Sequence, residues 1–578
     1  MLAASDRKGL ARLSVFSGGF RREAAKEIAD VGLDMLVNFV DKSLLRRDAF
    51  GRFQVHELIR QYLKRKLSED SNEHTSLLKR HSNFFGKFLS DRTDILWGEK
   101  QREAMDEIEV ELPNIRLAWK NALSNGQYDI IYSSIEPLYL FHQTRGWFKT
   151  CDELFEESLR ILDLNRHDDI LSRSCIILFK TRIGFLRGAL GRCEESRTIL
   201  KECLLEIENT DLPAVKILIL YGLSELTRRQ GDFDASVEYA EQCLSLAVQQ
   251  QNRRLQANAL SSLGMIAQNR GSYERATKFF RNSLDISNDL GYQRGIVRGL
   301  NGLGNVYYAR GDYSKARSCF RQGREKAEEL GERNLSAILA GSLGNIAVML
   351  GDYDEAKRLY VKRLLNAQSV GDESGIARGL FLLGGVHLRL NELEEAQHVL
   401  EKSAAIYKKT KEQRMIAFSL VTLADVRIAQ NNFNAAESLL RESLEIYEKI
   451  DLKQGIVFTL GNISEILLEQ EDFREANRLL RRALRIAHEM KSHQSILTIF
   501  HRFASLFERT GDLSRAAHLY KIVSTHESSA SDHRKDAEES LQRLNAKLAN
   551  ISISESTNIF RSTDPVILAE ELLNLDTR

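Results

Sequence analysis

Small and apolar positions recur every 40 residues through the middle of the chain. Nine turn-type positions, which we call the markers, set this register: Gly191, Gly231, Gly271, Gly311, Gly351, Asn391, Asn431, Glu471 and Gly511. Seven residues before each marker lies a small residue preceded by a bulky apolar one, as in Leu303-Gly304. A second small residue, such as Ala316, follows each marker by five positions. Three columns that hold register over nine copies predict a repeat array from about residue 177 to residue 524.

The residue types in these columns predict a helix, a turn and a second helix in every repeat. A glycine inside a helix costs about 1 kcal/mol relative to alanine, so a repeated helical glycine needs a packing reason. The close approach of a second helix supplies that reason, and the marker glycine can end the first helix in a left-handed conformation. An aromatic residue or leucine nine residues past the marker, such as Phe320, lies on the same helix face as the second small column. We therefore expect an all-α solenoid of antiparallel helix pairs.

The small residue, the turn Gly311-Asp312-Tyr313 and the following Ala316 resemble the tetratricopeptide repeat, here with a 40-residue period. The resemblance covers roughly 60% of the chain and is specific for the fold, but a repeat scaffold fixes a surface and not a chemistry. In that family helix pairs stack into a right-handed superhelix, and the first helix of each pair lines a concave groove.

The composition excludes several classes of function. The chain has 578 residues, with 82 Lys and Arg against 81 Asp and Glu, so no net field attracts nucleic acid or an anionic membrane. No apolar run approaches the ~20 residues that a membrane span needs, and no signal-peptide pattern is present. These features predict a cytoplasmic protein. The six cysteines form no CxxC pair and are expected to be reduced core residues.

The first 70 residues follow a different pattern. Helical composition over residues 22–31 and 33–40 is followed by two short strands, at 43–46 and 52–55, and by a helix at 56–67. Helices followed by a small hairpin and another helix predict a winged helix.

This segment resembles the winged helix of MalT/AfsR-like STAND signal-transduction ATPases and transcriptional regulators. The resemblance rests on residues 13–20, Asp41-Lys-Ser-Leu-Leu45 and Val55-His-Glu-Leu58. It implies that His56 faces the phosphates of a bound ADP. A histidine that starts a helix and caps it locally is an equally good interpretation.

The pattern divides the chain into four parts. We expect a winged-helix domain at 1–70, irregular helices and degenerate repeats at 71–170, nine repeats at 171–525, and a capping helix, a linker and a short C-terminal helix at 526–578. Pro565 in the first turn and Asp564 before it mark the start of the last helix.

No phosphate-binding loop of the form GxxxxGK[ST] occurs, and the single Gly-Lys pair, Gly86-Lys87, lacks the upstream glycine. The chain is therefore not expected to hydrolyse ATP alone. A nucleotide-binding domain could lie upstream in a longer gene product, could have been lost, or could belong to a separate chain. The histidines show no metal-ligand spacing and no nucleophile elbow occurs, so we expect neither a cofactor nor an enzyme.

The repeat register also predicts the residues of the groove. We expect the first helices to present to the groove the positions two, five and nine residues into each repeat, which we call the second, fifth and ninth columns. In the central part of the array the groove residues are Arg298, Asn301, Asn305, Tyr308, Asn345, Arg378 and Phe381. Arginines, amides and aromatic rings on a concave surface suit a peptide carboxylate, a phosphorylated ligand or an acidic partner segment. A solvated helix face without a ligand is the alternative.

Three functions are compatible with this pattern. The favoured one is a non-catalytic sensor arm that binds a protein or ligand for a STAND-type regulator. The second is a free-standing adaptor between proteins. The third is a regulator that contacts DNA through the winged helix, although the recognition segment 33–41 has no Arg or Lys and only Arg46, Arg47 and Arg52 lie on the wing.

Overall fold

The computed structural model describes residues 3–164, 169–208, 212–490, 492–526, 529, 531–550 and 564–574. The chain divides into two compact units, and each is considered by itself. Unit 1 comprises residues 1–228 and 233–379, and unit 2 comprises residues 229–232 and 380–578.

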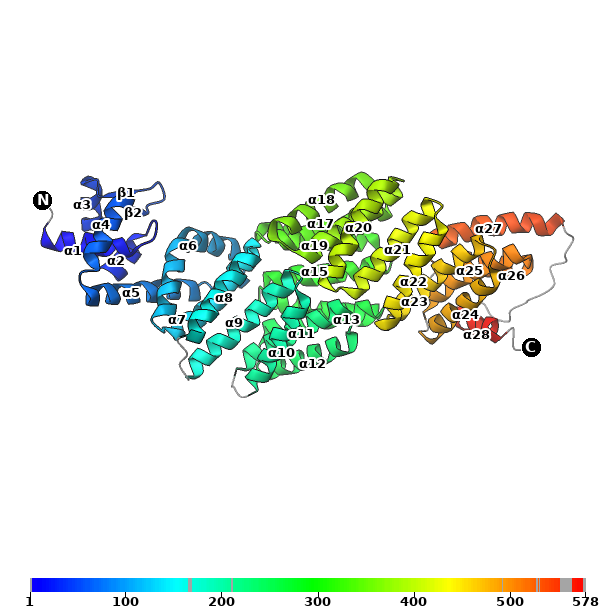
Figure 1. Cartoon of the computed structure of the whole chain (residues 1–578), viewed down its shortest axis with the longest axis horizontal. Coiled ribbons are helices and arrows are strands. Elements are labelled where there is room, and N and C mark those ends of the chain that lie inside the picture. The colour runs from blue at the N-terminus through cyan, green and yellow to red at the C-terminus, as the bar shows by residue number, and fades with distance from the viewer. Residues whose placement is uncertain are drawn as a thin grey trace. The chain divides into compact units, whose positions relative to one another are not determined.

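The N-terminal part of unit 1 consists of short helices around a two-stranded hairpin (Figure 1). Its elements are α1 (Ala4–Arg12), η1 (Leu13–Val15), α2 (Arg22–Ala29), α3 (Leu33–Asp41), β1 (Leu45–Arg47), β2 (Phe53–Val55) and α4 (Glu57–Leu67). The strands pair antiparallel with Leu45 opposite Val55. This order matches the expected helices, hairpin and helix, with one helix, α1, that the sequence pattern did not indicate.

Further helices connect this part to the repeats. They are α5 (Ser71–Ser90), η2 (Ile95–Trp97), α6 (Gln101–Ser124), α7 (Tyr128–Arg145) and α8 (Phe148–Leu164). We refer to η2, α6 and α7 together as the lead-in segment.

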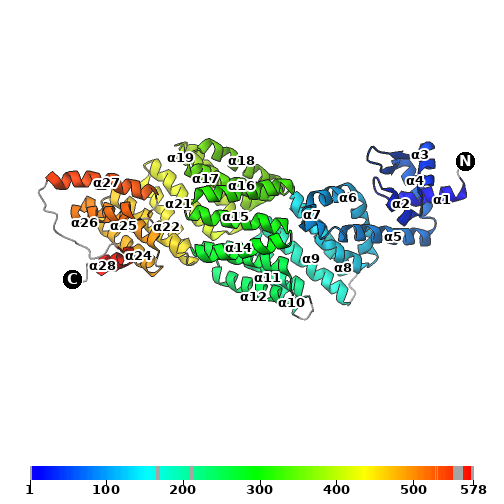
Figure 2. The same ribbon diagram turned by 180° about the vertical axis from the view of Figure 1, so that it is seen from behind.

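Nine helix pairs follow among the described residues, and Figures 1 and 2 show paired helices stacked in chain order within each unit. The first helices of the pairs are α9 (Ile170–Ala189), α11 (Pro213–Gln230), α13 (Arg253–Asn269), α15 (Gln293–Ala309), α17 (Arg333–Met349), α19 (Glu373–Arg389), α21 (Gln413–Ala429), α23 (Lys453–Glu469) and α25 (His493–Thr510). The second helices are α10 (Cys193–Ile207), α12 (Phe233–Gln249), α14 (Tyr273–Asp289), α16 (Tyr313–Glu329), α18 (Tyr353–Val370), α20 (Leu393–Thr410), α22 (Phe433–Lys449), α24 (Phe473–Glu489) and α26 (Leu513–Thr525). The predicted all-α repeat superhelix is confirmed.

The turn inside each pair has the predicted left-handed residue. All nine marker positions have positive φ, from glycines such as Gly311 at 80° to the non-glycine Glu471 at 62°. The next residue often caps the second helix, as Asp312 does by accepting a hydrogen bond from the backbone N–H of Lys315 at 3.1 Å. A second left-handed column, which the sequence did not reveal, lies between successive pairs and includes Gln251 at 51°.

The small column allows the two helices of a pair to pack closely. A Cβ atom added to Gly304 would lie 2.5 Å from Cε1 of Phe320, and one added to Gly344 would lie 2.5 Å from Cε1 of Tyr360. Both rings are nearly completely buried. The glycines of this column therefore provide the room for an aromatic ring of the second helix, as the repeat pattern predicted.

In the part of the chain that the structure describes, two helices follow the last pair in unit 2. They are α27 (Ser531–Asn550) and α28 (Pro565–Asn574). Asp564 accepts hydrogen bonds from the backbone N–H groups of Val566 and Ile567, and Arg481 on α24 donates to the carbonyl oxygen of Leu572 at 3.3 Å. Of the expected linker, residues 551–563 lie outside the described residues.

The cysteines are free, and all but Cys319 are buried. The Cys243 thiol donates to the carbonyl oxygen of Ile217 at 3.5 Å, and Ser283 one repeat later donates to Ala257 at 2.7 Å in the same way. Burial raises the pKa of Cys243 to about 12, so the thiol stays protonated. In this column the cysteine acts as a small core residue with a weak donor.

Candidate functional site

The residues of the predicted groove lie on one face of the first helices, which we call the inner face. This face carries the second, fifth and ninth column positions of each repeat. The two units present different chemistry on this face.

In unit 1 the inner-face side chains bond to one another. Arg298 on α15 donates to the hydroxyl of Tyr221 on α11 at 3.0 Å and to Oδ1 of Asn258 on α13 at 3.4 Å. Tyr292 donates to the same Asn258 oxygen at 3.3 Å. The neighbouring Tyr221 raises the pKa of Arg298, which keeps the guanidinium charged. Much of the hydrogen-bonding capacity of this face is therefore satisfied within the protein.

The other predicted groove residues of unit 1 are half-buried on the same face. Asn345 accepts a hydrogen bond from the Tyr360 hydroxyl at 2.7 Å, while the positive charge of Arg378 acts on the same tyrosine. The Oδ1 atom of Asn301 is buried and has no hydrogen-bond partner among the described residues. Tyr308 packs against the Tyr313 ring, with 5.7 Å between the ring centroids.

Asn305 is half-buried as well, on the same face of α15. Phe381 differs from the residues above because it belongs to unit 2. Only 8% of its surface is exposed, so it is a core residue behind the inner face and offers little contact area to a ligand.

The lead-in segment packs against the repeats of unit 1. Glu332, at the start of α17, is 1% exposed and accepts a hydrogen bond from Gln101 at 3.0 Å. Arg294 lies 3.5 Å from the same carboxylate and donates to Gln143 of α7 at 2.6 Å. Next to them, the Trp97 ring packs edge-on against Tyr292. The first helices of this unit thus make polar contacts both to one another and to the lead-in segment.

In unit 2 the inner face carries exposed aromatic rings. Phe418 on α21 and Phe458 on α23 occupy the second column of consecutive repeats and are 41% and 44% exposed. The centroid of the Phe418 ring lies 5.0 Å from that of the buried Phe381. Large apolar side chains this exposed, repeated at equivalent positions of neighbouring helices, are characteristic of binding surfaces.

Carboxylates accompany these rings. Asp425 and Glu465 lie seven residues after Phe418 and Phe458, which places each acid on the same helix face as its ring, about 10 Å along the axis. Glu465 forms an ion pair with Arg502, whose side chain is 6% exposed. By contrast, Asp425 makes no hydrogen bond or ion pair within the part of the chain that the structure describes.

The environment of Asp425 disfavours its negative charge. Burial, followed by repulsion from Glu465, raises the pKa of the Asp425 carboxyl to about 7, and the positive charges of Arg502 and Arg389 only partly oppose this shift. A positive charge brought next to this carboxylate from outside would be favourable.

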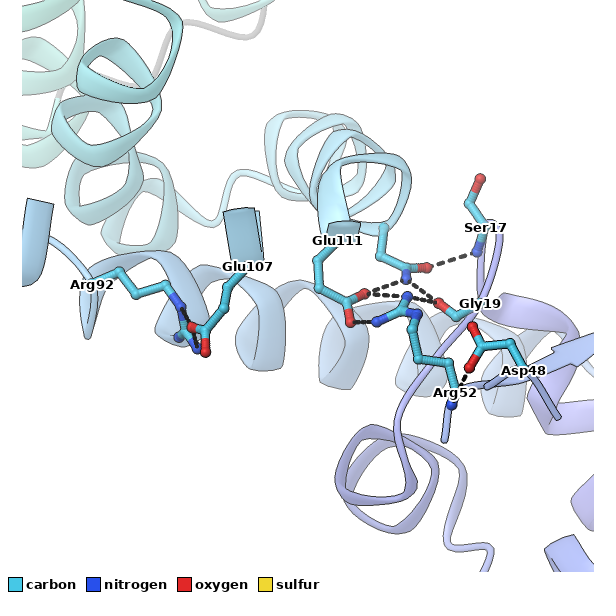
Figure 3. A network of polar contacts seen from close by, with 8 residues as sticks. Ser17, Gly19, Asp48, Arg52, Arg92, Glu107 and Glu111 are labelled. Atoms are coloured by element: carbon cyan, nitrogen blue, oxygen red, sulfur yellow. Dashed lines mark hydrogen bonds and ion pairs between the residues drawn. The ribbon is translucent and has the colours of Figure 1, made fainter. Parts of the chain in front are cut away.

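The N-terminal part of unit 1 corrects one expectation about DNA. Arg52 is 8% exposed and forms an ion pair with Glu111 of α6, and its Nη2 atom donates to the carbonyl oxygen of Gly19 at 2.6 Å (Figure 3). Asn114 accepts a hydrogen bond from the backbone N–H of Ser17 at 2.8 Å and donates to Gly19 at 2.9 Å. Arg52 therefore joins the hairpin to α6 and is not available to a DNA backbone.

His56, the residue expected to face a nucleotide, is exposed at the start of α4 and makes no side-chain capping hydrogen bond. It is the N-cap residue of α4, where its carbonyl oxygen accepts a hydrogen bond from the backbone N–H of Arg60 at 2.9 Å. The side chain is accessible to a ligand or to a neighbouring domain, and its nucleotide contact remains a prediction.

The described residues contain no group of three or more His, Cys, Asp or Glu side chains placed to hold a metal ion. Within the same residues, no helix combines the length and apolar character needed to cross a bilayer. A cavity of about 420 Å³ lies in unit 1 between the lead-in segment and α16–α18, and its lining includes Arg102, Arg145, Arg333 and Lys362. Acids such as Glu328 and Glu332 also line it, so its charge is mixed.

The sequence analysis missed the two inner-face phenylalanines of unit 2. The second column that selected Arg298 and Arg378 continues to Phe418 and Phe458, so extending that column would have found them. No local pattern indicates the contact between Gln101 and Glu332, because these residues are 231 positions apart.

Family models support the repeat assignment. A model of the MalT-like tetratricopeptide region matches residues 298–454, and two tetratricopeptide repeat models match residues 255–329 and 218–247. A model of the soluble NSF attachment protein, SNAP, matches residues 387–567. The repeats of this chain are tetratricopeptide repeats. No curated protein matches the sequence.

Several solved structures resemble the fold at low sequence identity. A Rap protein complexed with competence and sporulation factor has a TM-score of 0.49 and 14% identity, covering 63% of this chain and 99% of that one. A STAND protein with a tetratricopeptide repeat sensor from Pyrococcus horikoshii has a TM-score of 0.46 and 16% identity, covering 78% of this chain. The chain spans 64% of that protein's length. NprR in complex with its cognate peptide NprX has a TM-score of 0.42 and 18% identity, covering 54% of this chain and 88% of that one.

Proposed function

We propose that this chain is a non-catalytic scaffold that binds a peptide or an extended protein segment on the inner face of its tetratricopeptide repeats. The observation that carries the proposal is the pair of exposed rings, Phe418 and Phe458, at equivalent positions of consecutive first helices. Exposed aromatic side chains on a solenoid face cost solubility, and burial by a partner removes that cost. Asn305, half-buried on the inner face of unit 1, offers a separate candidate contact, because its amide suits a peptide backbone.

We further propose that the scaffold is the sensor arm of a STAND-type regulator, with residues 1–70 as its winged helix. The match of the MalT-like model over residues 298–454 supports this role, as does the order of helices and hairpin before α5. In this proposal His56 faces the nucleotide of an ATPase domain that lies upstream or on a separate chain. An in-frame phosphate loop in the genomic DNA upstream of the Met1 codon would support the first arrangement, and its absence would favour the second.

An adaptor without any ATPase partner is the second candidate. The match of the attachment-protein model to residues 387–567 favours it over a DNA-binding regulator. The burial of Arg52 leaves the wing with fewer free cations, which argues against direct DNA contact.

The binding function can be tested with a displayed library of random peptides selected against the full-length chain. We expect peptides whose binding is lost in a variant carrying Asn305→Ala, Asn345→Ala and Phe458→Ala. Leu365→Ala provides the control, because Leu365 is a 59% exposed apolar residue of a second helix. Failure to select any peptide, or selected peptides that bind the triple variant as well as the parent chain, would contradict the proposal.

A further inference from the structure

The inner face of unit 2 combines three features that together specify a ligand. It has an exposed aromatic ring on each of two consecutive first helices, a carboxylate two turns along each of those helices, and a buried arginine. Each of these features restricts the kind of ligand that the surface can bind.

The aromatic rings restrict the ligand to one with an apolar side chain. Phe418 and Phe458 project from α21 and α23 with more than two fifths of their surface exposed. Phe381 packs against Phe418 from behind, so the ring is supported while its outer side remains exposed. A leucine, methionine or aromatic side chain placed between the two rings would bury apolar area on both.

The carboxylates restrict the charge of the ligand. Arg502 donates to Oδ1 of Asn462 at 2.8 Å and pairs with Glu465, so one of the two acids is already compensated from inside the protein. The glycine at position 461 leaves room for the Arg502 side chain, because a Cβ atom at Gly461 would lie 2.6 Å from Nε of Arg502. The second acid, Asp425, lacks such a partner among the described residues. This surface therefore has one carboxylate without an ion-pair partner among the described residues, about 10 Å along α21 from the ring of Phe418.

The groups around Asp425 come from three neighbouring elements. Glu465 on α23 repels its charge, while Arg502 on α25 and Arg389 on α19 attract it. Burial is the largest influence, and the net result is a carboxyl with a raised pKa. A cationic side chain from a ligand would replace the lost solvation and favour the charged form.

The spacing of the two features sets the spacing in the ligand. Each ring is separated from its acid by seven helical residues, or about 10 Å. A peptide in the polyproline II conformation advances about 3.1 Å per residue and returns to the same face every three residues, so an apolar and a basic side chain about three residues apart would reach both.

We propose that the inner face of unit 2 binds an extended segment of a partner protein that carries an apolar side chain and, about three residues away from it, an arginine or lysine. The apolar side chain packs between Phe418 and Phe458, and the cation pairs with Asp425. This inference rests on the proposed peptide-binding function and adds the chemistry of the ligand. It differs from the sequence-based expectation of an acidic ligand, which rested on the arginines of unit 1.

The test uses three synthetic, fluorescently labelled peptides of about ten residues and the full-length chain at low salt. The first carries leucine and arginine at the stated spacing, the second has glutamate in place of arginine, and the third has serine in place of leucine. Fluorescence anisotropy measures the affinity of each. We expect the first peptide to bind roughly tenfold or more tightly than either of the others.

Variants of the protein test the contact with the aromatic rings and the contact with Asp425 separately. Phe458→Ala and Phe418→Ala should each weaken the first peptide roughly tenfold. Asp425→Asn should weaken the arginine peptide but leave the glutamate peptide unchanged or slightly stronger. Leu365→Ala is the matched control for loss of an exposed apolar residue, and circular dichroism of each variant verifies its helical content.

The outcomes separate this inference from the proposed function. If library-selected peptides bind the inner face but the glutamate peptide binds as well as the arginine peptide, the ligand chemistry is wrong and the scaffold function stands. If the arginine peptide binds but neither phenylalanine substitution changes its affinity, the location is wrong. If no peptide of any composition binds the inner face, both proposals fail.

Discussion

The inner faces of the two units use the same helix positions for different purposes. In unit 1, Arg298 bonds to Tyr221 and Asn258, and Glu332 holds Gln101 and Arg294. In unit 2, the column of Arg298 carries the exposed Phe418 and Phe458, and Asp425 has no ion-pair partner among the described residues. An equivalent position in a repeat therefore does not imply an equivalent role, because the partners available around it differ.

This difference suggests that the inner face of unit 1 contributes to stability and that the inner face of unit 2 contributes to binding. Polar residues that satisfy one another stabilise the fold of unit 1 and its lead-in segment. Apolar residues that remain exposed in unit 2 contribute little to the fold and are available to a ligand. Substitutions on the first face should therefore change stability, and substitutions on the second should change binding.

The largest expected effect is on the stability of unit 1. Glu332→Ala leaves Arg294 without its carboxylate partner in a buried site, which we expect to cost about 3–5 kcal/mol in the free energy of unfolding. Urea unfolding followed by circular dichroism measures the change. Glu355→Ala removes an exposed ion pair with Arg358 and should cost less than about 1 kcal/mol. Equal losses in both variants would contradict the structural role of Glu332.

Two glycines of the first helices give opposite results when changed to alanine. Gly304→Ala in unit 1 places a methyl group against Phe320 and should destabilise the protein by about 1–3 kcal/mol. Gly385→Ala in unit 2 meets no atom within 4 Å and should stabilise α19 by up to about 1 kcal/mol. Thermal unfolding of both variants checks the signs. A stabilising Gly304→Ala would contradict the close helix packing.

The carboxyl of Asp425 gives a pH-dependent prediction for unit 2. Its raised pKa means that the folded state holds the proton more tightly than the unfolded chain, so the stability contributed by this group falls as pH rises from about 4 to about 7. Asp425→Asn removes this dependence. We expect it to raise the unfolding midpoint by roughly 2–4 °C at pH 8 and by less at pH 5.

The contribution of Asp425 is best measured as the difference between the parent chain and the variant across the pH range. A gain in midpoint that is the same at pH 5 and pH 8 would show that the carboxyl titrates outside this interval. Thr422→Ser, an uncharged change on the same helix, controls for the general effect of pH on the two measurements.

The smallest expected effect on stability comes from the aromatic face. Phe458→Ala removes a ring that is 44% exposed, so the unfolding free energy should change by less than about 1 kcal/mol. Arg298→Ala, on the inner face of unit 1, should cost more because two hydrogen bonds to a charged group are lost. A larger loss for Phe458→Ala than for Arg298→Ala would remove the distinction between the two faces.

Much of the fold could be predicted from the sequence, because its determinants are local and repeated. The marker glycines predicted left-handed turns, and Gly304 predicted the aromatic ring that packs against it. Both depend on residues within one repeat. The positive φ at Gln251 was missed, because the turns between successive pairs use residues of different types at the equivalent positions.

The candidate site was predicted less well. The sequence identified Arg298 and Asn345 as inner-face residues, but it could not show that they bond to Tyr221 and Tyr360, which depends on how the helices are rotated. Phe381 was predicted as a ligand contact and is buried, because Phe418 of the next repeat covers it. Periodicity places a residue on a face, and its exposure depends on the neighbouring repeats.

Hydrogen–deuterium exchange of the full-length chain, with and without a saturating concentration of the leucine-arginine peptide, tests the central claim most directly. We expect slower exchange in α21 and α23 on peptide addition, with unchanged exchange in α11, α13 and α15. Protection confined to the inner face of unit 1, or to the second helices of the pairs, would contradict the claim that the exposed aromatic face of unit 2 is the binding surface.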